Sequence, residues 1–126
     1  MTHGQPKVLL IEDETSYRRT VKAYLEDSGY TVVEVADGRE GIELISREAP
    51  DVVICDLRMP VLDAFGVLDH VKAHHGSLPV IVITGTGNMA NSAVAHGAFR
   101  RLRKPIADIR DLEDAVSTAL ERGAAG

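Results

Sequence analysis

Tryptophan is absent from the chain, cysteine occurs once and aromatic residues make up only 4% of it, and these shortages narrow the class of protein. A single cysteine, Cys55, cannot form a disulfide framework, and its place within an apolar run predicts a buried side chain in a reducing compartment. No apolar stretch approaches the roughly 20 residues that a membrane-spanning helix requires, and the N-terminal MTHGQPK is too short and polar for a signal peptide. We therefore expect a cytoplasmic protein with no membrane partner.

Basic residues are also in the minority, with 14 against 19 acidic residues and a net charge of −5. Such a balance disfavours nucleic acid and anionic membranes as direct partners. The basic run Arg100–Lys104 lacks the interleaved aromatic residues of a nucleic-acid surface and does not alter that expectation. With 126 residues and 44% hydrophobic content, the chain suits one domain over residues 1–126, with its core at about residues 7–121.

What the chain does have is a regular alternation of short apolar runs and segments with helical periodicity. The runs predict strands at Lys7–Ile11, Thr31–Ala36, Asp51–Asp56, Pro79–Thr84 and Phe99–Arg103. The helical patterns cover Thr15–Ser28, Asp37 to Ala49, Asp63 to beyond Val71, about Met89–His96, and Asp108 to Gly123. Five such repeats predict an α/β fold, a doubly wound parallel sheet of five strands with helices on both faces.

Each of four predicted strands is followed by, or ends on, a residue suited to phosphoryl chemistry. These residues are Glu12 and Asp13 after the first strand, and then Asp56, Thr84 and Lys104. The carboxyl ends of parallel strands meet at one edge of a sheet, so we expect these side chains to share one crevice. Crowded carboxylates repel one another, and a hard cation such as Mg²⁺ relieves that repulsion by accepting their oxygens. Asp13 and Asp56 are the expected direct ligands.

The same residues can perform phosphoryl transfer. With a cation in place, Asp56 can attack a phosphoryl donor in line and become an aspartyl phosphate. Lys104 would neutralise the remaining negative charge, and the hydroxyl of Thr84 would donate to a phosphoryl oxygen. Phosphoryl transfer asks little else of a protein than positioning and electrostatic stabilisation.

These residues resemble the receiver domain of bacterial two-component response regulators, the CheY-like family. The resemblance runs from Val8 to about Leu120 and is carried by VLLIEDE at residues 8–14, DLRMP at residues 56–60, Thr84, GA at residues 97–98 and KP at residues 104–105. It implies a flavodoxin-like strand order of 2-1-3-4-5. It also implies a signalling switch whose phosphoryl donor is a phosphohistidine on a sensor histidine kinase or a histidine phosphotransfer protein. Such a domain catalyses only its own phosphorylation and dephosphorylation, and it passes the signal to a downstream protein.

The resemblance also assigns roles to single residues. It implies that Asp56 is the phosphoacceptor, that Glu12 acts on Mg²⁺ through water while Asp13 binds it directly, and that Thr84 is the switch hydroxyl and Lys104 the lysine of the site. The same cation would also take the backbone carbonyl oxygen of Arg58. We further expect Arg58 and Thr86, each two positions beyond a site residue, to border the path of hydrolytic water.

Three positions depart from the family pattern. Ala64 stands where the family usually has glycine, and Gly97 lies 13 positions after Thr84, about two fewer than in most relatives. Arg101 replaces a tyrosine or phenylalanine that commonly rotates inward, so an aromatic switch cannot operate here. Two readings of Arg101 stay open. It reads an acidic partner as an outward cation, or it protects an edge strand against pairing with other chains.

Weaker patterns in the sequence suggest other functions. A Mg²⁺-dependent phosphohydrolase of the haloacid dehalogenase type would need an acid two residues after Asp56, where this chain has Arg58. A scaffold that no longer takes phosphate would not need the intact acids, hydroxyl and lysine. TGTGN at residues 84–88 predicts a flexible turn rather than a flavin-phosphate loop. His70, His74 and His75 include an i,i+4 pair that could bind zinc, but no further ligand lies nearby in sequence, so we expect a solvated helix face.

Overall fold

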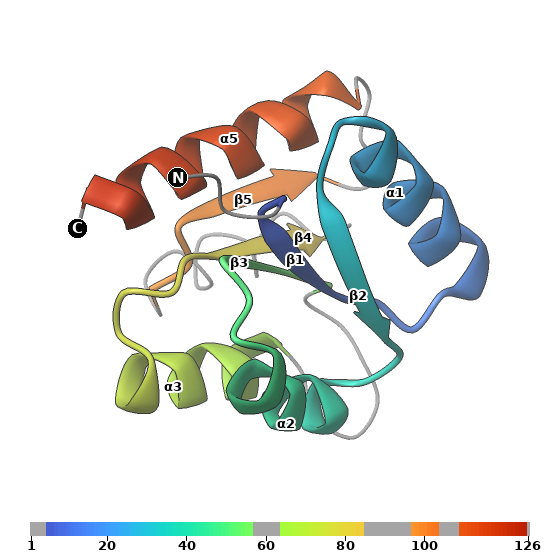
Figure 1. Ribbon diagram of the computed structural model, residues 1–126. Helices are drawn as coiled ribbons and strands as arrows, with labels where there is room; N and C mark the ends of the chain where they lie inside the picture. The colour runs from blue at the N-terminus through green and yellow to red at the C-terminus, as the bar shows by residue number, and fades with distance from the viewer. Residues whose placement is uncertain (1–4, 57–63, 85–96, 104–108, 126) are drawn as a thin grey trace.

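The structure, a computed structural model, describes residues 5–56, 64–84, 97–103 and 109–125. Its centre is a five-stranded sheet in the order β2-β1-β3-β4-β5, and every neighbouring pair is parallel. The strands are β1 (Lys7–Ile11), β2 (Thr31–Val35), β3 (Val52–Asp56), β4 (Val80–Thr84) and β5 (Arg100–Arg103). The strand order is the one that the resemblance implied, with β2 and β5 at the two edges (Figure 1).

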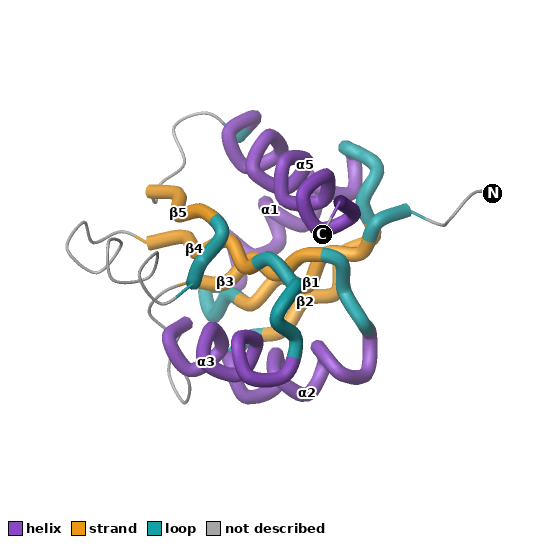
Figure 2. Tube along the Cα trace, turned by 90° about the vertical axis from the view of Figure 1, so that its left-hand side faces the viewer, coloured by secondary structure: helices purple, strands orange, loops and turns teal. Residues whose placement is uncertain are grey.

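Four helices complete the described part of the fold, and they lie in two layers. The helices are α1 (Thr15–Asp27), α2 (Gly38–Glu48), α3 (Ala64–His74) and α5 (Arg110–Ala125). Figures 1 and 2 show α1 and α5 on one face of the sheet and α2 and α3 on the other. The predicted α/β fold with a parallel sheet covered on both faces is therefore confirmed. The predicted helix at about Met89–His96 and the predicted caps Asp63 and Asp108 lie outside the described residues.

The core consists of two apolar clusters because successive strand residues point to opposite faces. Val53 and Cys55 pack with α2 and α3, whereas Val52 and Ile54 pack with α1 and α5. All five residues of β3 and all five of β4 are buried, as expected for strands covered on both sides. The single cysteine is buried, as predicted.

Local sequence explains several helix and strand boundaries. Asp37 precedes α2, and its Oδ1 accepts a hydrogen bond from the backbone N–H of Glu40 at 2.9 Å, as the predicted cap requires. Gly29 follows α1 with φ of 100°, a conformation that glycine adopts without strain. Ala49 was predicted inside α2. It lies just beyond the helix in a left-handed conformation, because Pro50 does not allow the helix to continue.

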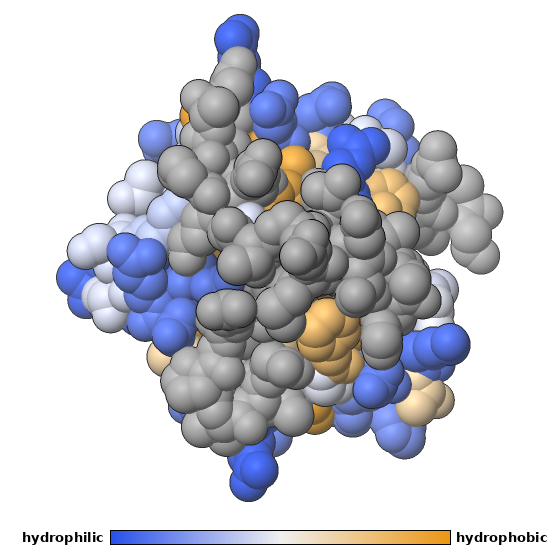
Figure 3. All heavy atoms as spheres, turned by 180° about the vertical axis from the view of Figure 1, so that it is seen from behind, coloured by the Kyte–Doolittle hydropathy of each residue, from blue (hydrophilic) through white to orange (hydrophobic). Residues whose placement is uncertain are grey.

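On one face of the molecule the described residues are mainly hydrophilic (Figure 3). Seen from behind, charged and polar residues dominate this face, and only small hydrophobic areas lie between them (Figure 3). Within the described ranges, no helix has the length and the apolar character that crossing a bilayer requires.

Candidate functional site

Three carboxylates meet at the carboxyl edge of the sheet. Glu12 and Asp13 directly follow β1, and Asp56 is the last residue of β3. The pairing of Ile11 with Cys55 brings the ends of these adjacent strands level. As a result, one carboxylate oxygen from each of the three acids lies within 4.8 Å of the others. The structure thus brings together the three acids that the strand-end pattern singled out.

Burial differs sharply among the three acids. Glu12 is 1% exposed and Asp56 is 8% exposed, whereas Asp13 lies on the surface. Carboxylates held this close repel one another unless a cation or a proton offsets their charge. Oxygen ligands without sulfur or nitrogen suit a hard divalent ion such as Mg²⁺, so the donor set fits that ion. The exposed Asp13 marks the side from which solvent reaches the cluster.

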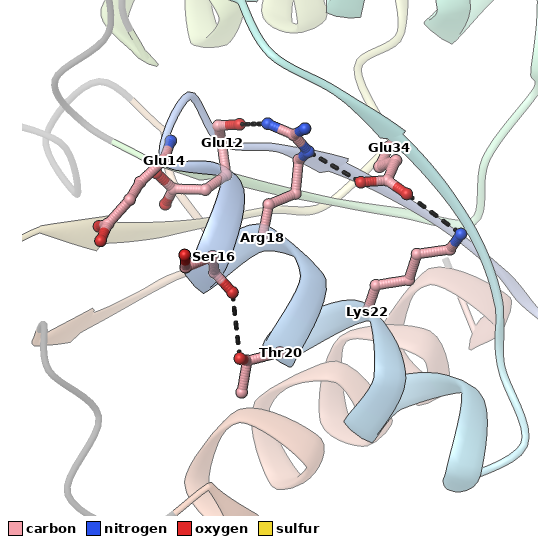
Figure 4. A network of polar contacts seen from close by, with 7 residues as sticks. All are labelled: Glu12, Glu14, Ser16, Arg18, Thr20, Lys22 and Glu34. Carbon is pink, nitrogen blue, oxygen red and sulfur yellow. Dashed lines mark hydrogen bonds and ion pairs between the residues drawn. The ribbon is translucent and has the colours of Figure 1, made fainter.

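The backbone and the side chain of Glu12 are held from three directions. Its N–H donates to the Val35 carbonyl of β2 at 3.1 Å. Its own carbonyl oxygen accepts from Nη1 of Arg18 at 2.8 Å, and its Oε2 accepts from the backbone N–H of Glu14 at 2.9 Å (Figure 4). The acidic turn after β1 is therefore fixed by β2, by α1 and by its own side chain.

Arg18 connects this turn to strand β2. Its Nε donates to Oε1 of Glu34 at 2.8 Å, and Nζ of Lys22 lies 3.1 Å from the other carboxylate oxygen of Glu34 (Figure 4). The hydrogen bonds from Arg18 and then Lys22 hold the pKa of Glu34 below its usual value. Sequence reasoning missed this network. The available indication was the polar Glu34 within β2, together with Arg18 and Lys22 spaced i,i+4 on α1.

Thr84 ends β4 beside the acids. Asp56 pairs with Ile83, so Thr84 lies one residue beyond the level of Asp56 on the neighbouring strand. The residue is 3% exposed, and it pairs on its other side with Arg103 of β5. The register therefore places a hydroxyl-bearing residue at the carboxyl edge that carries the acids. Lys104 and Arg58, the other two predicted site residues, lie outside the described residues.

The departures from the family pattern find different places in the fold. Ala64 begins α3 and is fully buried, so its methyl group adds to the core between α3 and the sheet. Gly97 has φ of 106°, and Ala98 after it is 7% exposed. The backbone of Arg101 belongs to the edge strand β5 and pairs with Val82.

Comparison with known proteins gives one consistent family. Residues 8–117 match the response regulator receiver domain. The chain is 34% identical over 116 residues to the Regulator of RpoS of Escherichia coli K12, covering 90% of this chain and 34% of that protein. It is 32% identical over 126 residues to the transcriptional regulatory protein GlrR of the same organism, covering 98% of this chain and 28% of that protein. The chain thus spans about a third of the length of these two relatives.

Solved structures show the same similarity in three dimensions. A response regulator receiver domain from Clostridium thermocellum superimposes with a TM-score of 0.89 at 33% identity, covering 95% of this chain and 98% of that one. The receiver domain of NtrX from Brucella abortus gives a TM-score of 0.84 at 32% identity, over 90% of this chain and 98% of that one. The fold, the acids at the carboxyl edge and the sequence match agree. The chain belongs to the response regulator receiver domains of two-component systems, a family of signalling domains rather than metabolic enzymes.

Proposed function

We propose that this receiver domain is a phosphorylation-dependent switch that accepts a phosphoryl group on Asp56 with the help of Mg²⁺. The observation that carries the proposal is the meeting of Glu12, Asp13 and Asp56 within 4.8 Å at the carboxyl edge of the sheet, next to the strand that ends in Thr84. An acidic cluster of this kind is costly to hold together without a cation, and a carboxylate within it is a suitable nucleophile for a phosphoryl group.

The donor class is a phosphohistidine on a sensor histidine kinase or a histidine phosphotransfer protein. A carboxylate oxygen of Asp56 forms the new O–P bond as the P–N bond of phosphohistidine breaks, and the departing imidazole nitrogen takes up a proton from solvent. The atoms and electrons of this step therefore balance. Asp13 and Asp56 would bind Mg²⁺ directly, Glu12 through a water molecule, and Arg58 through its backbone carbonyl. The bound ion would supply positive charge against the phosphoryl oxygens.

Two residues would contact the phosphoryl group once it is attached to Asp56. Thr84 would donate its hydroxyl hydrogen to a phosphoryl oxygen, and Lys104 would place its ammonium against another. If two conformations of the domain differ by a few kcal/mol, such contacts favour the one that makes them. Thr84 lies in the sheet next to edge strand β5, so a change there would reach the surface by a short route.

The wider setting follows from the same proposal. We place the switch in the cytoplasm, as a single receiver domain over residues 1–126. Its upstream partner is a kinase or phosphotransfer protein, and its downstream partner is a protein rather than nucleic acid or membrane. The net charge of −5 supports the second point, since an acidic surface repels polyanions.

Intact-mass measurement tests the proposal. The wild type, Asp56→Asn and Asp69→Asn are incubated with acetyl phosphate and Mg²⁺; Asp69 is an exposed aspartate of α3 and provides the matched control. We expect one phosphoryl mass on the wild type and on Asp69→Asn, and none on Asp56→Asn. A wild type that gains no mass under any Mg²⁺ concentration would contradict the proposal and favour a scaffold. Steady release of phosphate from unrelated phosphoesters would favour a phosphohydrolase instead.

A further inference from the structure

Three histidines gather at the end of α3 that lies away from the acidic site. The ring centroid of His70 is 4.7 Å from that of His74 and 5.6 Å from that of His75, and the last two are 6.5 Å apart. Because α3 leads from the carboxyl end of β3 back to the start of β4, its last turn lies at the amino edge of the sheet. The histidine cluster and the acidic cluster therefore occupy opposite ends of the domain.

The expectation that these histidines form a solvated helix face holds for His74 and is too simple for the other two. His74 is exposed, but His70 and His75 are half-buried. The Nε2 atom of His70 is buried, and it has no hydrogen-bond partner among the residues that the structure describes. Neutral imidazole is the form of histidine that binds metal ions.

We propose that His70, His74 and His75 form a binding site for a borderline divalent cation, with Zn²⁺ as the fitting ion. Zn–N bonds of about 2.0–2.1 Å place the ring centres of two tetrahedral ligands about 5 Å apart. The two separations that involve His70, 4.7 and 5.6 Å, lie on either side of that value. Among the described residues only the acidic cluster already has its ligand atoms close enough together for a cation, so the histidine rings must rotate to bind one; His74 is exposed and has room to do so.

The backbone around the cluster supports this arrangement. His70 and His74 lie four residues apart on α3, so they project from the same face of the helix. The N–H of His75 donates to the Val71 carbonyl at 2.7 Å and continues the helical pattern, and its own carbonyl accepts from the N–H of Leu78 at 2.9 Å. The three Cα positions are therefore held by helix and turn hydrogen bonds. Only side-chain torsions have to change when a cation enters.

Ligand chemistry separates this site from the acidic one. Imidazole nitrogen is a borderline ligand that suits Zn²⁺, whereas the three carboxylates at the other edge suit Mg²⁺. The inference does not depend on phosphorylation of Asp56, because no residue of the acidic cluster takes part in it. A water molecule would complete the tetrahedral coordination.

Calorimetric titration with Zn²⁺ in the presence of saturating Mg²⁺ tests the proposal. We expect the wild type to bind one equivalent of Zn²⁺, and His74→Gln and His70→Gln each to bind it at least roughly tenfold more weakly, because each loses one ligand. Lys72→Gln, an exposed change on the same helix, is the control and should bind as the wild type does. No Zn²⁺ binding by the wild type, or equal binding by the His70→Gln/His74→Gln double variant, would overturn the proposal.

Further measurements distinguish loss of Zn²⁺ ligation by the histidines from loss of folding and from Zn²⁺ binding at the acidic cluster. Zn²⁺ should shift the imidazole C–H resonances of three histidines in the NMR spectrum, and this reports ligation without relying on variants that fold poorly. His74 is exposed, so His74→Gln should retain the wild-type circular dichroism spectrum even if His70→Gln does not. Asp13→Asn should leave Zn²⁺ affinity unchanged; a loss of Zn²⁺ binding in that variant would assign the ion to the acidic cluster and contradict the histidine site.

Discussion

Arg18 helps to hold the acidic turn after β1 in position. Its guanidinium reaches the Glu12 carbonyl at 2.8 Å and the Glu34 carboxylate at 2.8 Å, and its side chain is only 14% exposed. Charge-assisted hydrogen bonds of this length are stronger than neutral ones. A bond to a carbonyl also fixes the direction of the peptide that precedes Asp13. The position of the acidic turn is therefore linked to strand β2 through one side chain.

We predict that Arg18→Ala weakens Mg²⁺ binding roughly tenfold, the lower end of the range seen when groups that orient metal ligands are removed. The physical reason is that the Glu12 carbonyl loses its cationic donor and the Glu34 carboxylate keeps only Lys22, so the acidic turn is no longer tied to strand β2 through Arg18. Mg²⁺ titration followed by NMR measures the effect, and Arg19→Ala, an exposed neighbour, is the control. Glu34→Gln should weaken Mg²⁺ binding less than Arg18→Ala does. The Arg18→Ala/Glu34→Gln double variant should lose less binding free energy than the two single variants together. Strict additivity would show that Arg18 does not act through Glu34.

Lowering the pH should reduce the contribution that the contacts among Arg18, Glu34 and Lys22 make to the free energy of unfolding. The pKa of Glu34 is lowered in the folded protein, so the folded state binds its proton less readily than the unfolded chain does. The contribution is therefore complete above the unfolded value of about 4.3 and is lost as pH falls through the lower folded value. We predict that urea unfolding of the wild type loses more free energy between about pH 5 and pH 3 than that of Glu34→Gln. Equal losses would contradict the assignment.

At the residue scale, sequence reasoning found the acids and missed what surrounds them. Glu12, Asp13 and Asp56 could be predicted because the parallel sheet fixes where strand ends meet. The bond from Arg18 to the Glu12 carbonyl could not, since a backbone carbonyl has no signature in the sequence; only the pairing of Arg18 with Glu34 left an indication there. The burial of the Nε2 atom of His70 was likewise beyond helical periodicity, which gives the face of a residue but not the rotamer of its side chain.

At the scale of elements, the contact between α2 and β1 leaves no room for a side chain at Gly41. A Cβ atom on Gly41 of α2 would overlap Cδ1 of Ile11 and would lie 3.0 Å from its Cγ1. Ile11 is fully buried, so the closely packed core leaves little space into which its Cδ1 atom could rotate. The absence of a side chain at Gly41 allows α2 to approach the sheet at this point.

We predict that Gly41→Ala destabilises the domain by about 1 kcal/mol, although alanine is the better helix former by a similar amount. The overlap with Ile11 outweighs the gain in helix propensity because the surrounding core is closely packed. Chemical denaturation measures the change. Ile11→Val should cost less in the Gly41→Ala background than in the wild type, since it removes the overlapping Cδ1 atom. Gly76→Ala, with nothing within 4 Å of its added carbon, is the control.

Element types were predictable throughout the described chain, and their ends less so. The alternation of apolar runs with helical patterns gave the class of all five strands and of α1, α2, α3 and α5. Strand β2 ends one residue earlier than predicted, at Val35, and α1 ends at Asp27 rather than Ser28. Such ends depend on which peptide groups find partners, and apolar periodicity does not report that.

At the scale of the whole molecule, an apolar core stabilises the fold and a cluster of like charges at the carboxyl edge of the sheet destabilises it. The two apolar clusters on either side of the sheet supply the stabilising burial, and they place two nearly buried carboxylates and a third exposed one at a single point. Like charges at such distances oppose folding, whereas a cation bound only by the folded state favours it. We therefore expect Mg²⁺ to stabilise the domain. We also expect a single substitution in the cluster to change whether the variant or the wild type is the more stable protein.

We predict that Asp13→Asn raises the melting temperature in the absence of Mg²⁺ and abolishes the further rise that Mg²⁺ gives the wild type. Removing one of three clustered charges, at the exposed Asp13, relieves repulsion worth up to about 1 kcal/mol. At a Mg²⁺ concentration a hundredfold above Kd, the wild type gains about 2.7 kcal/mol, so the order of the two proteins should reverse. Thermal unfolding with and without Mg²⁺ measures both effects, and Asp69→Asn is the charge-matched control. An Asp13→Asn protein that is less stable than the wild type without Mg²⁺ would show that its carboxylate serves the fold rather than the cation.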